Sequence, residues 1–125
     1  MGQRMKVLVV DDELPIRDEI RLMGLEKYGY EIVGEATNGK AALELCERLQ
    51  PDIVITDITM PVMDGLELIR PLQKTKPLIK YILLTCHEDF VYARQALQQG
   101  ALDYIIKADI SAEGIVGVLD RARGI

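Results

Sequence analysis

The sequence predicts an α/β protein, (βα)5, in which five parallel strands form one doubly wound sheet with helices on both faces. Short runs rich in Val, Ile and Leu alternate with longer stretches whose apolar residues recur at helical spacing. The apolar runs are nearly continuous, as expected for parallel strands that are covered on both sides. A regular strand–helix alternation favours a parallel sheet with right-handed crossovers.

The five predicted strands share β-branched and aliphatic centres bounded by polar or turn residues. Each is separated from the next by a helical stretch, which is the length of chain that a parallel crossover requires. The predicted strand ranges are 5–10, 31–36, 52–56, 80–85 and 103–107.

The first predicted helix follows Pro15, because proline suits the first turn of a helix. Its apolar stripe is Ile16, Ile20 and Met23, and Gly29 is predicted to end it. The second begins after the N-cap Asn38 and stops before Pro51.

The third predicted helix begins near Asp64, and Pro71 in its interior predicts a kink or an early end because proline removes a backbone hydrogen bond. The fourth runs over about 88–99 and closes at Gly100. The fifth follows Ser111 and contains two glycines that each weaken a helix by roughly 1 kcal/mol relative to alanine. That helix is expected to depend on packing.

Length and composition predict one domain over 1–125, with an ordered core of about 5–123. The net charge of −5 argues against a domain that grips nucleic-acid phosphates. The sequence shows no membrane-length apolar run and no secretory leader, which predicts a cytoplasmic protein. Cys46 and Cys86 lack the spacing of a motif and are expected to be reduced thiols.

Polar residues follow four of the predicted strands. Asp11 and Asp12 end the first strand, Asp57 the third, Thr85 the fourth and Lys107 the fifth. In open α/β sheets, ligands bind beyond the carboxyl ends of the strands. Neighbouring carboxylates raise one another's pKa unless a cation neutralises them, and an all-oxygen cluster suits Mg²⁺. Lys107 and Thr85 would then bind an anion held on the metal.

Each of these residues also has an ordinary structural reading. An aspartate at a strand end is often a turn residue or a helix cap, and a lone lysine is often only a solvated charge. Their joint occurrence at four strand ends is what favours a functional site.

Four stretches, "VLVVDDE", "IVITDITMPVMDG", "YILLT" and "GALDYIIK", occur in this order. With these motifs the chain resembles a response-regulator receiver domain of bacterial two-component signalling over essentially its whole length. The resemblance implies a five-stranded sheet in the flavodoxin-like order 2-1-3-4-5.

The resemblance also implies site roles. Asp57 matches the aspartate that accepts a phosphoryl group from a sensor histidine kinase. Asp11 and Asp12 match the acidic pair that holds Mg²⁺, together with Asp57 and the backbone carbonyl of Thr59. Lys107 matches the lysine that assists phosphoryl transfer.

Thr85 and Tyr104 match the switch pair of the family, in which the hydroxyl moves toward the phosphoryl group and the ring turns inward. The face formed by helix four, strand five and helix five is then expected to form a homodimer or to act on an output domain. Phosphorylation would shift the population between two packings.

The sequence departs from the family pattern in the last loop. Ala108 stands where proline usually follows the lysine, so we predict a trans peptide and a rearranged loop, because a cis bond without proline costs roughly 3 kcal/mol. Cys86 stands beside the expected phosphate pocket in place of a smaller residue, where it could narrow access. His87 is interpreted as a loop residue.

The stretch "CHEDFVYARQALQQGALDYIIK" resembles receivers of regulators that carry an arabinose-regulator (AraC-type) helix-turn-helix output domain. The parent protein would then be a DNA-binding transcription regulator. No helix-turn-helix is recognised within these 125 residues, so the output domain is expected to lie outside them.

Three other functions compete with this interpretation. A haloacid-dehalogenase-type phosphatase shares the strand-end Asp, Thr, Lys and Mg²⁺, but Thr59 stands where its second aspartate is needed. A pseudo-receiver would keep the fold as a binding module only. A flavodoxin relative would need Gly, Ser and Thr around a phosphate, whereas the loop after strand one is acidic.

Overall fold

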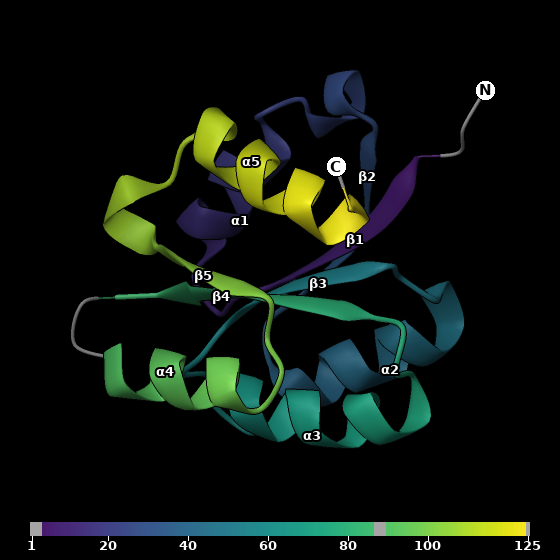
Figure 1. Cartoon of the computed structure of the whole chain (residues 1–125), viewed down its shortest axis with the longest axis vertical. Coiled ribbons are helices and arrows are strands. Elements are labelled where there is room, and N and C mark those ends of the chain that lie inside the picture. Colours follow the sequence, from purple (N-terminus) through teal and green to yellow (C-terminus); the bar gives the residue numbers. More distant parts are fainter. Residues whose placement is uncertain (1–3, 87–89, 125) are drawn as a thin grey trace.

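The predicted alternation of strands and helices is present in the computed structural model, which describes residues 4–86 and 90–124 (Figure 1). Five parallel strands form one sheet in the order β2-β1-β3-β4-β5, which confirms the fold class and the strand order. The strands are β1 (Met5–Val10), β2 (Tyr30–Ala36), β3 (Ile53–Asp57), β4 (Lys80–Thr85) and β5 (Asp103–Ile106).

Helices cover both faces of the sheet. Figure 1 shows α1 and α5 on one face and α2, α3 and α4 on the other. The α-helices are α1 (Leu14–Arg21), α2 (Gly39–Leu49), α3 (Gly65–Thr75), α4 (Phe90–Gln98) and α5 (Ala112–Arg123). Short 3₁₀ helices lie before β2 and after β5, at η1 (Leu25–Tyr28) and η3 (Lys107–Asp109).

The sheet separates two hydrophobic cores. Along β3, Ile53 and Ile55 pack on the side of α1 and α5, whereas Val54 packs with the core under α2, α3 and α4. All three are fully buried. Burial of such side chains stabilises the fold by about 1.5–3 kcal/mol each. The central strands are therefore held from both sides, which fixes the positions of their carboxyl ends.

Three predicted helix starts are confirmed by their caps. Asn38 accepts a hydrogen bond from the Ala41 amide, and Ser111 accepts one from the Gly114 amide. Asp64 and Glu67 form a reciprocal capping box at the start of α3. These side chains satisfy amides that a helix leaves without intrahelical partners.

The first helix ends earlier than predicted. It stops at Arg21 instead of continuing to Gly29, and Gly24 then adopts a left-handed conformation with φ of 69°. This turn allows Leu25 to enter the core in the separate helix η1, which Gly29 ends. Burial of Leu25 therefore competes successfully with continuation of the helix.

Pro71 does not end the third helix, so of the predicted kink or early end the early end is wrong and the kink stays a prediction. The helix continues to Thr75, whose hydroxyl donates to the Pro71 carbonyl. Leu68 and Leu72 on either side of the proline are buried. Their packing holds the helix together despite the missing backbone donor.

The loop after β5 contains the Lys107–Ala108 peptide bond, for which the sequence predicts the trans form. Among the described residues no peptide bond is cis, so the predicted trans Lys107–Ala108 bond is confirmed. Lys107 itself belongs to η3 instead of the predicted strand.

In the described part of the chain no helix is long and apolar enough to cross a membrane.

Candidate functional site

The carboxyl edge of the sheet brings together the charged residues that the sequence singled out. Asp57 is the last residue of β3, Asp11 follows β1, and Lys107 follows β5. Lys107 Nζ lies 2.9 Å from Asp57 Oδ2, 2.9 Å from Asp11 Oδ2 and 2.6 Å from Glu13 Oε2. One ammonium group therefore joins three strand-end segments that are far apart in sequence.

Burial makes this cluster electrostatically demanding. The Asp11 side chain is fully buried, the Asp57 side chain is 6% exposed and the Lys107 side chain is 11% exposed. Charges removed from water cost several kcal/mol each unless they are paired. The lysine compensates the two buried carboxylates in part, because it carries one positive charge against two negative ones.

The imbalance shows in the pKa values. Burial raises the pKa of Asp57 to about 6, although the hydrogen bond from Lys107 opposes it. Burial also raises the pKa of Asp11, against the hydrogen bond from the Glu13 amide. Burial alone would lower the pKa of Lys107, but the surrounding carboxylates outweigh it and raise the value, so this group is a cation at pH 7.

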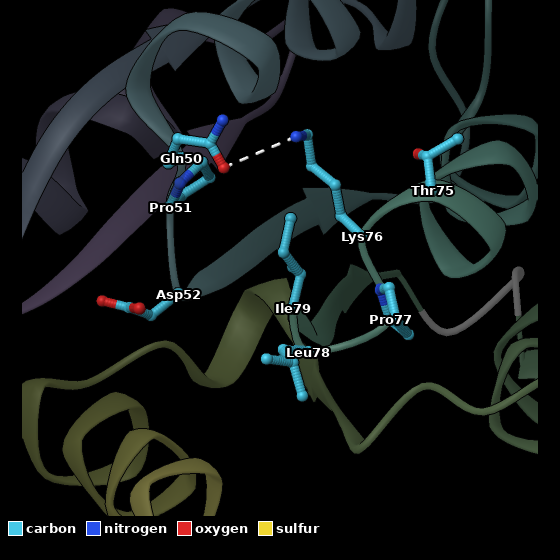
Figure 2. Close-up of a pocket in the computed structure, with 8 residues that line it drawn as sticks. All are labelled: Gln50, Pro51, Asp52, Thr75, Lys76, Pro77, Leu78 and Ile79. Carbon is cyan, nitrogen blue, oxygen red and sulfur yellow. Dashed lines mark hydrogen bonds between the residues drawn. The ribbon is translucent and has the colours of Figure 1, made fainter.

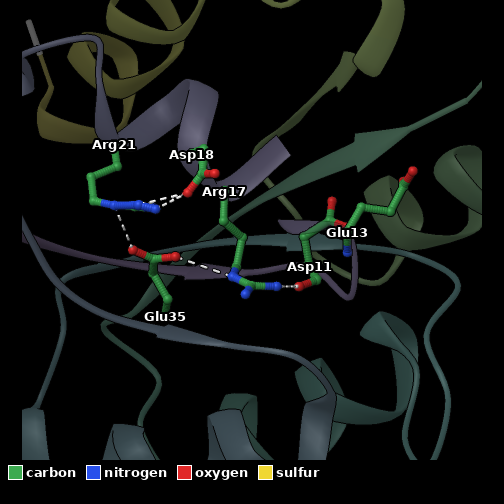
Figure 3. A network of polar contacts seen from close by, with 6 residues as sticks. All are labelled: Asp11, Glu13, Arg17, Asp18, Arg21 and Glu35. Atoms are coloured by element: carbon green, nitrogen blue, oxygen red, sulfur yellow. Dashed lines mark hydrogen bonds and ion pairs between the residues drawn. The ribbon is translucent and has the colours of Figure 1, made fainter. Parts of the chain in front are cut away.

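The turn after β1 is held by hydrogen bonds between main-chain and side-chain groups. The Glu13 amide donates to Asp11 Oδ1 at 2.8 Å, and Arg17 Nη1 donates to the Asp11 carbonyl at 2.7 Å. Figure 3 shows Arg17 reaching between this turn and Glu35 of β2, to which its Nε donates at 3.1 Å. Arg21 also donates to Glu35 and pairs with Asp18. The network fixes the main chain that presents the acidic side chains.

A divalent cation fits this edge. Asp11, Asp12, Glu13 and Asp57 each offer an oxygen, and these oxygens lie within 4.8 Å of one another. Asp11 Oδ2 is buried, and the partner that the structure gives it is the Lys107 ammonium group at 2.9 Å, which Glu13 and Asp57 share. A buried carboxylate whose charge is compensated only in part, beside three further carboxylates, belongs to the kind of oxygen set that binds Mg²⁺.

The close approach of α3 to Asp57 depends on a glycine. A Cβ on Gly65 would clash with the Asp57 carbonyl oxygen, which is a backbone atom and cannot move aside as a flexible side chain could. The Gly65 amide also donates to the Ile58 carbonyl at 2.8 Å. Gly65 therefore allows the chain after Asp57 to turn tightly back onto the end of β3.

The other predicted residues lie around this cluster with different degrees of support. Thr85 is buried at the end of β4, and its hydroxyl donates to the Cys86 carbonyl at 3.0 Å. Tyr104 of β5 is half-buried against the core under α3 and α4. Thr59 is exposed and lines a hollow with Asp64 and Tyr92. The role of its carbonyl as a Mg²⁺ ligand stays a prediction.

The sequence analysis also singled out Cys86 and His87, which follow β4. Cys86 is half-buried and Cys46 is buried, and neither cysteine forms a disulfide within the described residues. His87 lies outside the described residues.

Two residues of the site were not among the predicted ones. Glu13 makes the shortest contact to Lys107, and Arg17 holds the Asp11 carbonyl. The run of three carboxylates in "DDE" pointed to Glu13, but the lysine lies 94 residues away in sequence. No local signal pointed to Arg17, whose i+6 contact depends on the turn before α1.

A pocket of about 380 Å³ lies at the opposite edge of the sheet, where β3 and β4 begin (Figure 2). Pro51 and Leu78 line this pocket. Two further lining residues are joined by a hydrogen bond, which Lys76 Nζ donates to Gln50 Oε1. Ligands of open α/β sheets bind at the carboxyl edge, and the buried charges lie there too. We therefore place the candidate site at the carboxyl edge.

Comparison with known proteins gives a consistent answer. A family model described as "Response regulator receiver domain" matches residues 7–117. The chain is 41% identical over 107 residues to chemotaxis protein CheY of Thermotoga maritima, covering 86% of this chain and 87% of that protein. It is 38% identical over 117 residues to the transcriptional regulatory protein YdfI of Bacillus subtilis, covering 94% of this chain but only 54% of YdfI.

Solved structures agree with the fold. The receiver (REC) domain of AraT, a response regulator from Geobacillus stearothermophilus, superimposes with a TM-score of 0.88 at 33% identity, covering 96% of this chain and 93% of that one. The receiver domain of the putative response regulator NarL from Mycobacterium tuberculosis gives 0.87 at 33% identity, covering 99% and 100%. From the family match and these likenesses, the chain belongs to the response regulator receiver domain family.

Proposed function

We propose that this domain accepts a phosphoryl group on Asp57 from a sensor histidine kinase. The observation that carries the proposal is the buried cluster in which Lys107 Nζ lies 2.9 Å from both Asp57 and Asp11, beside carboxylates that fit a cation. Receiver domains of response regulators interact with histidine kinases, which supplies the partner class.

The chemistry follows from the charges. An Asp57 oxygen attacks the phosphorus of a phosphohistidine, a P–O bond forms, and the P–N bond breaks with the imidazole as leaving group. Such transfers need positioning and charge neutralisation more than covalent help. Lys107 supplies one positive charge to the incoming phosphoryl oxygens. Asp11, Asp12, Asp57 and the Thr59 carbonyl would hold Mg²⁺, which neutralises the remaining negative charge.

The signal would pass through the second half of the sheet. Thr85 lies at the end of β4, and Tyr104 lies in the neighbouring strand β5. Movement of the Thr85 hydroxyl toward the phosphoryl group would let the Tyr104 ring turn inward and change the face of α4, β5 and α5. Exposed Val91 and Tyr92 on α4 and Leu102 before β5 support a homodimer contact there.

We further propose that this receiver controls transcription in the cytoplasm through a DNA-binding domain outside these 125 residues. The chain spans about half of YdfI and 28% of the transcriptional regulatory protein YesN of Bacillus subtilis, to which it is 40% identical. An AraC-type output is supported by the similar structure of a two-component transcriptional regulator AraC from Clostridium phytofermentans, with a TM-score of 0.80 at 27% identity. A two-component response regulator of the LuxR family is also among the similar structures, and a LuxR-type output is therefore the alternative.

Intact-mass measurement tests the phosphoacceptor role. We expect the protein incubated with Mg²⁺ and acetyl phosphate to gain one phosphoryl group. Asp57→Ala should gain none, and Asp52→Ala should behave as the wild type because Asp52 lies at the other end of β3. Equal labelling of Asp57→Ala, or no labelling of the wild type, would contradict the proposal.

A further inference from the structure

Glu13 stands in an unusual place for a glutamate. It is the N-cap residue of α1, yet its side chain makes no capping hydrogen bond. Ser, Thr, Asp and Asn are preferred at that position because their short side chains reach the first helix amides. The Glu13 side chain instead extends to Lys107, with 2.6 Å between Oε2 and Nζ. The cap is therefore given up for a contact in the candidate site.

The donor hydrogens of Lys107 are already shared among carboxylates before any phosphoryl group arrives. An ammonium group has three hydrogens to donate. Three carboxylate oxygens already lie within 2.9 Å of Nζ, from Asp11, Glu13 and Asp57. Phosphorylation converts the Asp57 carboxylate into an acyl phosphate, and its phosphoryl oxygens, which carry more charge than the carboxylate did, then compete with Asp11 and Glu13 for the donors of Lys107.

Burial indicates which contact is released. Asp11 is fully buried and held by the Glu13 amide, and the Asp57 side chain is 6% exposed. The Glu13 side chain is 57% exposed, so its carboxylate can turn into water by side-chain rotation alone. Phosphorylation adds about −1.5 to −2 charges, which repel Glu13 and attract Lys107.

We propose that Glu13 occupies Lys107 in the unphosphorylated domain and competes with the phosphoryl group for it. Glu13 is then a positioning residue that lowers the affinity of the site for a phosphoryl anion. This inference rests on the proposed phosphoacceptor function. Ion pairs with one exposed partner contribute up to about 1 kcal/mol, which corresponds to an effect of about twofold to fivefold.

The test uses beryllium fluoride, which mimics a phosphoryl group on a carboxylate, at saturating Mg²⁺. The concentration that half-saturates the protein is followed by ¹⁹F NMR. We expect Glu13→Gln to lower this concentration about twofold to fivefold. The matched control is Asp109→Asn, which removes one negative charge from exposed η3. The control should change the value by less than half as much.

The Mg²⁺ affinity without beryllium fluoride separates this role from metal ligation. A lost metal ligand should weaken Mg²⁺ binding tenfold or more and weaken binding of the mimic with it, which would overturn the inference. An unchanged half-saturation value in Glu13→Gln, or an equal change in Asp109→Asn, would also overturn it. If the wild type does not bind the mimic at all, the proposed function fails and the inference falls with it.

Discussion

The two aspartates that flank β3 have opposite situations. Asp52, just before the strand, accepts a hydrogen bond from the Lys6 amide at 2.8 Å, and its main chain bonds to Lys6 and Lys80. Asp57, at the other end, is buried with a raised pKa among other carboxylates. An aspartate thus links strands at the amino edge of the sheet, whereas at the carboxyl edge the charge of an aspartate is compensated only in part, by Lys107. Natural proteins keep such local conflicts at functional sites.

Removal of a lysine should expose the difference most strongly. Lys107→Ala leaves buried Asp11 and Asp57 without a cation, and we expect a loss of about 3 kcal/mol in the free energy of unfolding at pH 7. At the amino edge, Lys6 Nζ donates only to the Leu49 carbonyl among the described residues. Lys6→Ala should therefore cost about 1 kcal/mol.

Urea unfolding measures both values, and Mg²⁺ should restore part of the stability of Lys107→Ala but none of that of Lys6→Ala. Equal losses in the two variants would show that the carboxyl edge carries no special charge imbalance.

Replacement of Asp57 and of Asp52 should change the free energy of unfolding in opposite directions. Asp57→Ala is expected to stabilise the protein by about 1–2 kcal/mol at pH 7 without Mg²⁺, because a pKa raised from 3.8 to about 6 means that ionisation disfavours the folded state. Asp52→Ala should destabilise it by about 1 kcal/mol, because the Lys6 amide loses its acceptor.

The pH dependence follows from the same pKa. The folded-state pKa of Asp57 lies above that of the free residue, so its contribution to stability is complete below about pH 4 and is lost as the pH rises through about 6. Chemical unfolding at pH 4, 5, 6 and 7 measures this loss. As the pH rises from 4 to 7, the free energy of unfolding of Asp57→Ala should fall less than that of the wild type. Parallel pH profiles would argue against a raised pKa at Asp57.

The smallest expected effect concerns backbone strain. Val62 follows Asp57 in the next loop with φ of 70° and is 75% exposed, whereas Gln50 at the amino edge has φ of 51°. The left-handed region is costlier for a β-branched residue than for a linear one. Val62→Gly should raise the free energy of unfolding by about 1 kcal/mol. Gln50→Gly should raise it less, because the substitution also removes the side-chain hydrogen bonds of Gln50. Thermal unfolding of the pair gives the comparison.

Most of the fold could be predicted because its signals are local. Caps such as Asn38 and Ser111 and the apolar strand runs mark where elements begin. The early end of α1 could not be predicted, since it depends on burial of Leu25 against distant strands. The low helical propensity of proline also failed to predict where α3 ends, because the packing of Leu68 and Leu72 carries the helix past Pro71.

The site divides in the same way. Asp11, Asp57 and Lys107 were predictable because parallel strands deliver their ends to one edge. The contact of Glu13 with Lys107 and the hold of Arg17 on the Asp11 carbonyl depend on side-chain directions within a turn. Neither follows from spacing along the chain.

The central claim is that the charge imbalance of the carboxyl edge serves to bind a cation. Urea unfolding of the wild type and Asp57→Ala, with and without Mg²⁺, tests it most directly. At ten times its dissociation constant, Mg²⁺ should raise the unfolding free energy of the wild type by about 1.4 kcal/mol, and that of Asp57→Ala by much less. An equal gain in both proteins would contradict the account.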